Sequence, residues 1–266
     1  KARQSKGKAR LAAYDKLHAE SQAAERGDNK LEIAIPPGPR LGDVVIEVKN
    51  LSKGYGDRLL IEDLTFNLPP AGIVGIIGAN GAGKTTLVMH MNGIHPAEHG
   101  KVSVAGEVID TTDKDLLRRI RGKVGVVFQD PDDQLFMPTV GEDVAFGPYN
   151  MGIRGAELDR AVDEALAMVH MSEFKERPPH HLSFGQRRRV AVATVLAMKP
   201  EILVLDEPSS NLDPAGRREL AEILRSLDVT IVMVTHDLPY AFELCERSVI
   251  LSGGVIVADG KTGDIL

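Results

Sequence analysis

The chain is poor in cysteine and has no long apolar segment, and each shortage excludes a class of protein. Cys245 is the single cysteine among 266 residues, so an intramolecular disulfide is excluded. Its apolar neighbours Ala241, Phe242 and Leu244 favour a buried, unreactive thiol. No run approaches the roughly 18 apolar residues that a bilayer-spanning helix needs, and no signal peptide opens the chain. We therefore expect a cytoplasmic protein, either free or peripheral on the inner face of the cell membrane.

Composition and charge indicate one folded body with a distinct front segment. Hydrophobic residues make up 43% of the sequence, which is enough for one substantial core and excludes a disordered chain. Residues 1–40 carry nine basic and five acidic side chains, a net charge of +4; since the whole chain has −6, the remainder carries −10. The segment Ile35-Pro36-Pro37-Gly38-Pro39 breaks any helix and marks a boundary. A basic helical linker arm over residues 1–41 indicates either RNA or another acidic surface as a partner, or a solvated linker, and composition leaves both open.

Beyond Gly42, apolar runs alternate with helical patterns, which predicts an α/β fold over residues 42–266. Continuous apolar runs suit a mostly parallel sheet covered on both faces, and the earlier strands suit a small antiparallel β subdomain. Residues from about 131 to 181 lack strand patterns and predict an inserted helical subdomain. The expected strands are 44–48, 59–68, 73–77, 101–108, 124–128, 202–205, 230–234 and 249–251, and the expected helices are 85–92, 115–121, 155–170, 184–198, 215–227 and 239–245.

A glycine-rich segment follows the apolar run 73–77 and reads Gly78-Ala79-Asn80-Gly81-Ala82-Gly83-Lys84-Thr85-Thr86. It fits the pattern G-x-x-x-x-G-K-[ST], in which glycines let successive backbone N–H groups turn toward a phosphate chain. Lys84 supplies an ammonium at the β- and γ-phosphate oxygens, and the Thr85 hydroxyl can ligate Mg²⁺. A helix beginning near Gly83 adds the positive end of its dipole. A plain turn between strand and helix is the weaker alternative, so the segment predicts binding of a nucleoside triphosphate.

A second motif is an apolar strand that ends in two acids, Ile202-Leu203-Val204-Leu205-Asp206-Glu207-Pro208. Asp206 at the strand end can join the Mg²⁺ shell, and Glu207 can act on the attacking water, which is the division of labour that nucleotide hydrolysis needs. Two solvated acids after a strand are the alternative. The phosphate loop upstream makes that alternative the weaker one.

With these motifs in this order, the chain resembles the nucleotide-binding domain of ABC ATPases. The segment Leu182-Ser183-Phe184-Gly185-Gln186 is similar to the family signature L-S-G-G-Q. The resemblance implies that Ser183, Gly185 and Gln186 face the γ-phosphate held by a second ATPase domain, in a homodimer or a heterodimer. It also implies ATP as the nucleotide and Mg²⁺-dependent hydrolysis at the interface of the two domains.

The same resemblance implies roles for four further residues. Gln129 matches the Q-loop glutamine that senses Mg²⁺ and water and couples to the partner, and His236 matches the switch histidine. Asp213 ends the D-loop sequence Ser210-Asn211-Leu212-Asp213, and Tyr55 matches the aromatic that stacks on adenine. Alone, each of these residues also fits an ordinary role as a turn residue, a helix cap or a strand aromatic.

Phe184 stands where the family signature has its first glycine. The pattern L-S-F-G-Q is similar to that of cobalt-type and energy-coupling-factor importer ATPases, as are the segments 127–136 and 139–148, so we expect activity to survive. This branch implies an ATPase subunit that energises an importer of a metal ion such as cobalt, or of a vitamin. Its helical subdomain is expected to dock on a transmembrane importer subunit, and that partner chooses the solute.

The front of the chain resembles a different family. Residues 1–17, 35–43 and 56–61 are similar to the interdomain linker and second ATPase domain of ABC-F proteins, which gate translation on the ribosome. On this interpretation the chain is composite, with a seam within 73–86, and we expect the poorest core packing where 59–68 meets 101–108. The alternative function is a ribosome-associated translation-factor ATPase. The presence of one ATPase domain, where ABC-F proteins carry two, counts against it.

Overall fold

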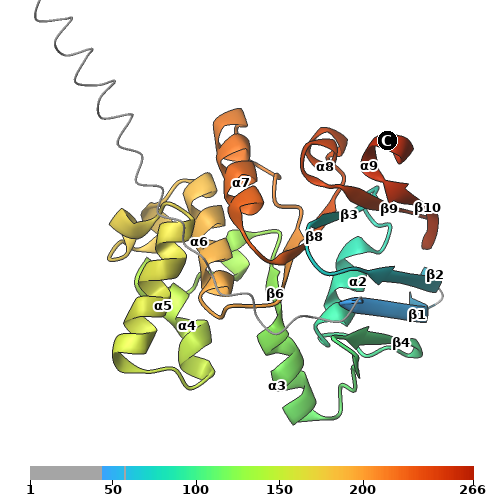
Figure 1. Cartoon of the computed structure of the whole chain (residues 1–266), viewed down its shortest axis with the longest axis horizontal. Coiled ribbons are helices and arrows are strands. Elements are labelled where there is room, and N and C mark those ends of the chain that lie inside the picture. Colours follow the sequence, from blue (N-terminus) through green and yellow to red (C-terminus); the bar gives the residue numbers. More distant parts are fainter. Residues whose placement is uncertain (1–43, 57) are drawn as a thin grey trace, which may run out of the picture. The chain divides into compact units, whose positions relative to one another are not determined.

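The computed structural model describes residues 44–56 and 58–266 (Figure 1). The expected basic arm over residues 1–41, the break at 35–39 and the expected RNA or ribosome contact of residues 1–40 lie outside the described residues. The described part consists of two sheets with helices packed on them.

The larger sheet has six strands in the order β10-β9-β3-β8-β7-β6. Neighbouring strands run parallel except for the pair β9 and β10, which is antiparallel. Every residue of β7 and β8 is buried, as expected for apolar runs covered on both faces. Because the carboxyl ends of parallel strands meet at one edge, the loops after β3, β7 and β8 lie together there. The strands are β3 (Ile73–Gly78), β6 (Val124–Val127), β7 (Ile202–Asp206), β8 (Thr230–Thr235), β9 (Arg247–Ser252) and β10 (Val255–Lys261).

The smaller sheet is antiparallel, in the order β2-β1-β4-β5, with strands β1 (Ile46–Tyr55), β2 (Arg58–Leu68), β4 (His99–Val104) and β5 (Glu107–Val108). The predicted strand 44–48 is too short, because β1 continues through register shifts as far as Tyr55. The predicted strand 101–108 is two strands, because Ala105 and Gly106 form a turn with φ of +48° and +80°.

Helices cover the sheets and form the segment that was expected to be a helical subdomain. They are α2 (Lys84–Met91), α3 (Lys114–Lys123), α4 (Val140–Asn150), α5 (Gly155–Met168), α6 (Phe184–Leu196), α7 (Pro214–Ser226), α8 (Leu238–Leu244) and α9 (Thr262–Ile265), with single 3₁₀ turns η1 (Pro131–Asp133), η2 (Ser172–Phe174) and η3 (Pro179–His181). Helix α4 was not among the predicted helices, because Gly141, Gly147 and Pro148 weaken its pattern. A capping box of Thr139 and Glu142 starts it. No helix of the described part combines the length and apolar character that crossing a membrane requires.

Alternate residues of the parallel strands feed two hydrophobic clusters on opposite faces of the sheet. Leu203 and Leu205 join the cluster under α4 to α8, whereas Val204 joins the cluster shared with α2 and the antiparallel sheet. Near the expected seam, Ile61 and Val102 are both buried to 2% exposure or less in this second cluster, and the expected poor packing there stays a prediction. Strand β1 lies between β2 and β4, so the two segments do not pair directly.

Candidate functional site

The loop after β3 turns tightly and needs its glycines. Gly81 and Gly83 have φ of +79° and +92°, in the left-handed region that favours glycine. A Cβ on Gly78 would lie 2.5 Å from the carbonyl oxygen of Leu251, too close for any side chain. The tip residues Ala79, Asn80 and Gly81 are exposed, whereas Ala82 is buried and fixes the loop in the core. The loop therefore has the shape of an anion cradle in front of α2.

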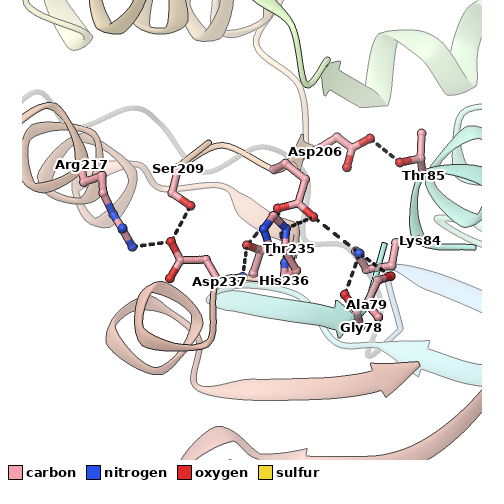
Figure 2. Close-up of polar contacts among 11 residues, drawn as sticks. Gly78, Ala79, Lys84, Thr85, Asp206, Ser209, Arg217, Thr235, His236 and Asp237 are labelled. Atoms are coloured by element: carbon pink, nitrogen blue, oxygen red, sulfur yellow. Dashed lines mark hydrogen bonds and ion pairs between the residues drawn. The ribbon is translucent and has the colours of Figure 1, made fainter. Parts of the chain in front are cut away.

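Lys84, the first residue of α2, directs its ammonium back into this loop (Figure 2). Its Nζ donates to the carbonyl oxygens of Gly78 at 2.7 Å and Ala79 at 3.1 Å. The same atom lies 3.5 Å from Oε1 of Glu207, and both side chains are only 6% exposed. The predicted phosphate-binding cation and the predicted general base therefore meet at the edge of the sheet. The remaining predicted loop residue, Thr86, lies in the first turn of α2, where its carbonyl oxygen is 2.7 Å from Nδ1 of His90.

Thr85 and Asp206 form the next contact of the cluster (Figure 2). The Thr85 hydroxyl donates to Oδ2 of Asp206 at 2.7 Å. The other carboxylate oxygen of Asp206, Oδ1, is buried with no hydrogen-bond partner in the described part of the chain. Burial raises the pKa of the Asp206 carboxyl above its ordinary value, the hydrogen bond from Thr85 opposes this, and the charge of Glu207 adds to it. A hydroxyl and an orphaned carboxylate oxygen side by side fit a hard divalent cation such as Mg²⁺.

Glu207 is 4% exposed and is held by the last residue of β8, Thr235, and by His236, which follows it. Its Oε2 accepts from the Thr235 hydroxyl at 3.2 Å and from the His236 backbone N–H at 3.3 Å. Its Oε1 lies 2.8 Å from Nδ1 of His236, whose ring is half exposed. Oε2 is therefore fixed by two hydrogen bonds, whereas Oε1 has the imidazole nearby but no hydrogen-bond partner in the described residues, and the exposed imidazole marks the side from which a water molecule can approach.

A second polar cluster anchors the same segment from behind (Figure 2). Oδ2 of Asp237 accepts from the Ser209 hydroxyl at 3.0 Å and from the Arg217 guanidinium on α7. Asp237 also caps α8 by accepting from the Tyr240 N–H at 3.1 Å. These contacts tie the segment that carries His236 to the residues around the predicted D-loop. Asp213, which ends that loop, is exposed and caps α7 through the Gly216 N–H at 2.7 Å.

The signature residues stand at the start of α6. Ser183 and Gln186 form a capping box, in which the Ser183 Oγ accepts from the Gln186 N–H at 3.2 Å and the Gln186 Oε1 accepts from the Ser183 N–H at 2.9 Å. The Phe184 ring centroid lies 5.4 Å from the Arg188 guanidinium carbon. In the described residues, Ser183, Gly185 and Gln186 make no hydrogen bond to the phosphate loop. They form the start of α6, where Ser183 is exposed and Gly185 and Gln186 are half-buried, and they are not part of the Lys84 cluster.

Tyr55 and Gln129 also lie outside the hydrogen-bonded cluster. The Tyr55 ring at the end of β1 is 51% exposed, its hydroxyl lies 3.2 Å from Nε2 of His95, and Nζ of Lys53 is 5.2 Å from the ring centroid. This leaves ring surface free for stacking. Gln129 is exposed, and within the described residues its side chain makes no hydrogen bond to Thr85 or Asp206.

Three polar residues of this region were missed by the sequence analysis. Thr235 holds the carboxylate of Glu207, Arg217 holds Asp237, and Arg188 donates to backbone carbonyls of the Gln129 loop. A threonine before a histidine carries no distinct signal. The run Arg187-Arg188-Arg189 is visible in the sequence, but a run of basic residues normally predicts a solvated surface.

Comparison with known proteins places this geometry in a family. Residues 61–210 match the family model described as ABC transporter. A protein of Streptomyces coelicolor with a provisional name as an ABC transporter ATP-binding protein is 70% identical over 222 residues, which cover 83% of this chain and 84% of that protein. The energy-coupling factor transporter ATP-binding protein EcfA of Carboxydothermus hydrogenoformans is 46% identical over 222 residues, covering 82% of this chain and 81% of that protein.

Solved structures agree with the sequence relatives. CbiO1 from Clostridium perfringens, described as part of the ABC transporter complex cbiONQ, has a TM-score of 0.78 and 35% identity, covering 84% of this chain and 90% of that chain. The ATP-binding cassette MJ0796, solved as a dimer in a post-hydrolysis state bound to ADP and Pi, has a TM-score of 0.72 and 29% identity, covering 82% of this chain and 98% of that chain.

The same comparisons bear on the expected seam. Residues 87–266 number only 180, so matches over 222 residues extend about 40 residues in front of Leu87. These two transporter ATP-binding proteins therefore also match the part of the chain that holds the antiparallel strands. The resemblance of the front segments to ABC-F proteins, and the ribosome partner that it implied, find no support in these comparisons.

Proposed function

Because the chain belongs to the ABC transporter family, we propose that it is the ATP-hydrolysing subunit of an energy-coupling importer for a metal ion such as cobalt, or for a vitamin. The observation that carries the ATPase part is the meeting of Lys84, Glu207 and His236 at one edge of the parallel sheet. The importer part is supported by the relative named EcfA and by the fold similarity to CbiO1, a part of the cbiONQ complex.

Mg²⁺ fits the residues between the loop and β7. The Thr85 hydroxyl and the orphaned Oδ1 of Asp206 would hold it, with Gln129 reaching in from its loop. When bound, the ion supplies positive charge that offsets the charge of the phosphate oxygens. Asp206 suits this role because its burial without a full set of partners is costly until a cation neutralises it.

Hydrolysis requires a base that is fixed and a cation that stabilises charge. Glu207 accepts the proton of the attacking water, while the Thr235 hydroxyl and the His236 backbone N–H hold its Oε2 and leave Oε1 without a hydrogen-bond partner in the described residues. Lys84 moves its ammonium from the loop carbonyls to the terminal phosphates and so offsets the charge that develops there. Tyr55 provides the exposed aromatic surface on which adenine stacks.

A second ATPase domain completes the site. Ser183, Gly185 and Gln186 form a capped helix start, and a helix N-terminus is the kind of surface that binds a phosphate. Since these residues make no hydrogen bond to the phosphate loop of the same described chain, they serve the loop of a second copy or of a related ATPase. Asp213, exposed at the start of α7, faces the same partner.

The helical subdomain, residues 131–181 within a nucleotide-binding domain of residues 42–266, provides the contact with a transmembrane subunit. Phe136 and Phe146 stack edge to face with centroids 4.9 Å apart and are 62% and 45% exposed. Beside them a hollow of about 360 Å³ is lined by Asp132, Leu135, Phe136, Met137, Pro179, His180 and Arg187. Exposed aromatic residues around a hollow are typical of protein interfaces. This contact holds the chain on the inner face of the membrane.

The proposal is tested by purifying the tagged chain from detergent-solubilised membranes of the organism that encodes it, with ribosome pelleting in parallel. A multi-spanning membrane protein in stoichiometric amount, lost in the variant Phe136→Asp but kept in Phe242→Asp, is the expected result. Phe242 is equally exposed, at 62%, but lies on α8. Pelleting with ribosomes and no membrane partner would overturn the importer role.

A further inference from the structure

Helix α6 carries a fully buried guanidinium that reaches the loop after β6. Arg188 is 0% exposed and donates to the carbonyl oxygens of Phe128 at 2.8 Å and Gln129 at 2.5 Å. These two residues follow β6, which packs against α6 (Figure 1). A side chain of the signature helix therefore holds the backbone on which Gln129 stands.

A second side chain fastens the same loop from the opposite direction. Gln134 follows η1, and its Oε1 accepts from the Phe128 N–H at 3.1 Å. Its Nε2 donates to the Ala191 carbonyl oxygen at 2.8 Å and to the Thr194 hydroxyl at 2.7 Å, both on α6. The peptide groups of Phe128 are therefore held on both sides, the N–H by Gln134 and the C=O by Arg188.

The burial of Arg188 is costly for the fold. Among the described residues no carboxylate lies within ion-pair distance of it, and its Nε has no hydrogen-bond partner. Burial lowers the pKa of the guanidinium, while the charges of Asp130 and Asp206 raise it. A buried cation without a paired anion is a poor source of stability, and an apolar side chain of similar volume would serve packing as well. The presence of an arginine at position 188 is therefore better explained by its hydrogen bonds to the carbonyl oxygens of Phe128 and Gln129.

We propose that Arg188 and Gln134 are positioning residues that make the loop 128–134 and helix α6 move as one body. Gln129 and Ser183 then keep a fixed relation, and a push on the nearby Phe136 surface displaces both. An ion pair of 2.8 Å between Arg187 Nε and Asp132 Oδ1 adds a third link between the same two segments. This proposal rests on the proposed function, because it concerns how contact with a membrane subunit reaches the ATP site.

The test is a double-mutant cycle on the purified full chain, with ATP hydrolysis and ATP affinity measured separately. Arg188→Met should lower kcat by at least ~10-fold through misplacement of Gln129, while the ATP dissociation constant changes less than about twofold, because the phosphate loop is untouched. The double variant Arg188→Met with Gln129→Ala should have the same kcat as Gln129→Ala alone, because both changes remove the same contribution of Gln129 to hydrolysis. Hydrogen exchange of residues 128–134 should become faster.

Arg189→Met is the matched control, since Arg189 is the next residue on α6 but pairs with Glu219 and makes no hydrogen bond to the loop. Any change in kcat that Arg189→Met causes should multiply with the change caused by Gln129→Ala, because the two residues act independently. If Arg188→Met does not fold, Gln134→Leu provides the same cycle from the other side of the loop.

Two results would overturn the proposal: a double variant whose kcat falls by the product of the single effects, or unchanged exchange of the loop in both variants. A wild-type chain without ATP hydrolysis would instead contradict the proposed function. In that case the exchange measurement alone decides whether the loop and the helix are fastened together.

Discussion

His236 contacts both oxygens of the Glu207 carboxylate. Its Nδ1 lies 2.8 Å from Oε1, and its backbone N–H donates to Oε2 at 3.3 Å. The backbone contact does not depend on the side chain, so the carboxylate keeps two of its holding groups, this N–H and the Thr235 hydroxyl, when the imidazole is removed. The imidazole therefore lies on the exposed side of the carboxylate, where the proposed site places the attacking water and the terminal phosphate.

Replacing Lys84 by Ala should weaken ATP binding by roughly 10²-fold, because the ammonium is the one buried cation at the phosphate loop in the described part of the chain. Titration calorimetry measures the effect. Lys114→Ala, on the exposed start of α3, is the control and should bind ATP like the wild type. Unchanged affinity in the Lys84 variant would exclude the assignment of this loop.

Replacing Glu207 by Gln should preserve ATP affinity and slow hydrolysis by at least ~10², since the amide keeps the hydrogen-bonded position but cannot take a proton. ATP should then hold two copies together, which light scattering detects as a dimer. Glu222→Gln, on the exposed face of α7, should turn over normally. Rapid turnover in Glu207→Gln would require another base.

Asp206 makes the nucleotide-free protein less stable at neutral pH. Because burial raises the pKa of this carboxyl from 3.8, the folded state binds a proton at pH values where the unfolded state has lost it. Stability therefore falls as pH rises above 3.8 through the folded pKa. Asp206→Asn should raise the thermal midpoint at pH 7, by roughly 2–4 °C for each kcal/mol recovered, and should flatten this decline.

The same variant should lose the extra stabilisation that Mg²⁺ with ATP gives the wild type. Thermal scans with and without Mg²⁺ and ATP test both parts. Asp159→Asn, at an exposed position of α5, is the control and should change neither the thermal midpoint at pH 7 nor the stabilisation by Mg²⁺ with ATP. A lower midpoint for Asp206→Asn at pH 7 would contradict the assigned cost of burial.

A site shared between two copies predicts complementation. Lys84→Ala breaks the phosphate loop, and Ser183→Arg blocks the signature helix start, so each variant alone should be inactive. Their heterodimer contains one intact loop that faces one intact signature. An equimolar mixture should therefore regain hydrolysis that neither variant shows, and a mixture without activity would contradict the shared site.

The parallel sheet and the edge that carries the site could be predicted from the sequence, because short continuous apolar runs such as 202–205 and 230–234 suit a strand buried on both faces. The topology then follows from short right-handed connections, and it brings Lys84, Asp206 and His236 together. The phosphate loop could also be predicted, from the spacing of the glycines at 78, 81 and 83. Few residues other than glycine tolerate the backbone conformation of this loop.

Other features lacked a local signal. Helix α4 contains two glycines and a proline, so tertiary packing and the Thr139 cap outweigh its weak propensity. Arg188 is buried through the contact of α6 with the loop after β6, and a basic run gives no hint of that contact. Register shifts in β1 likewise arise from pairing with two neighbours at once, which no window of sequence contains.

Glu207 has a φ of +47°, in the left-handed region that costs a residue with a Cβ about 1–2 kcal/mol. Such a conformation suits Gly or Asn better, so the fold itself would favour their presence at this position. Only the need for a carboxylate keeps glutamate there. In evolutionary terms, a duplicate of this gene that is released from turnover should lose the base early, because replacement of Glu207 by Gly or Asn removes the base and relaxes the backbone in one step.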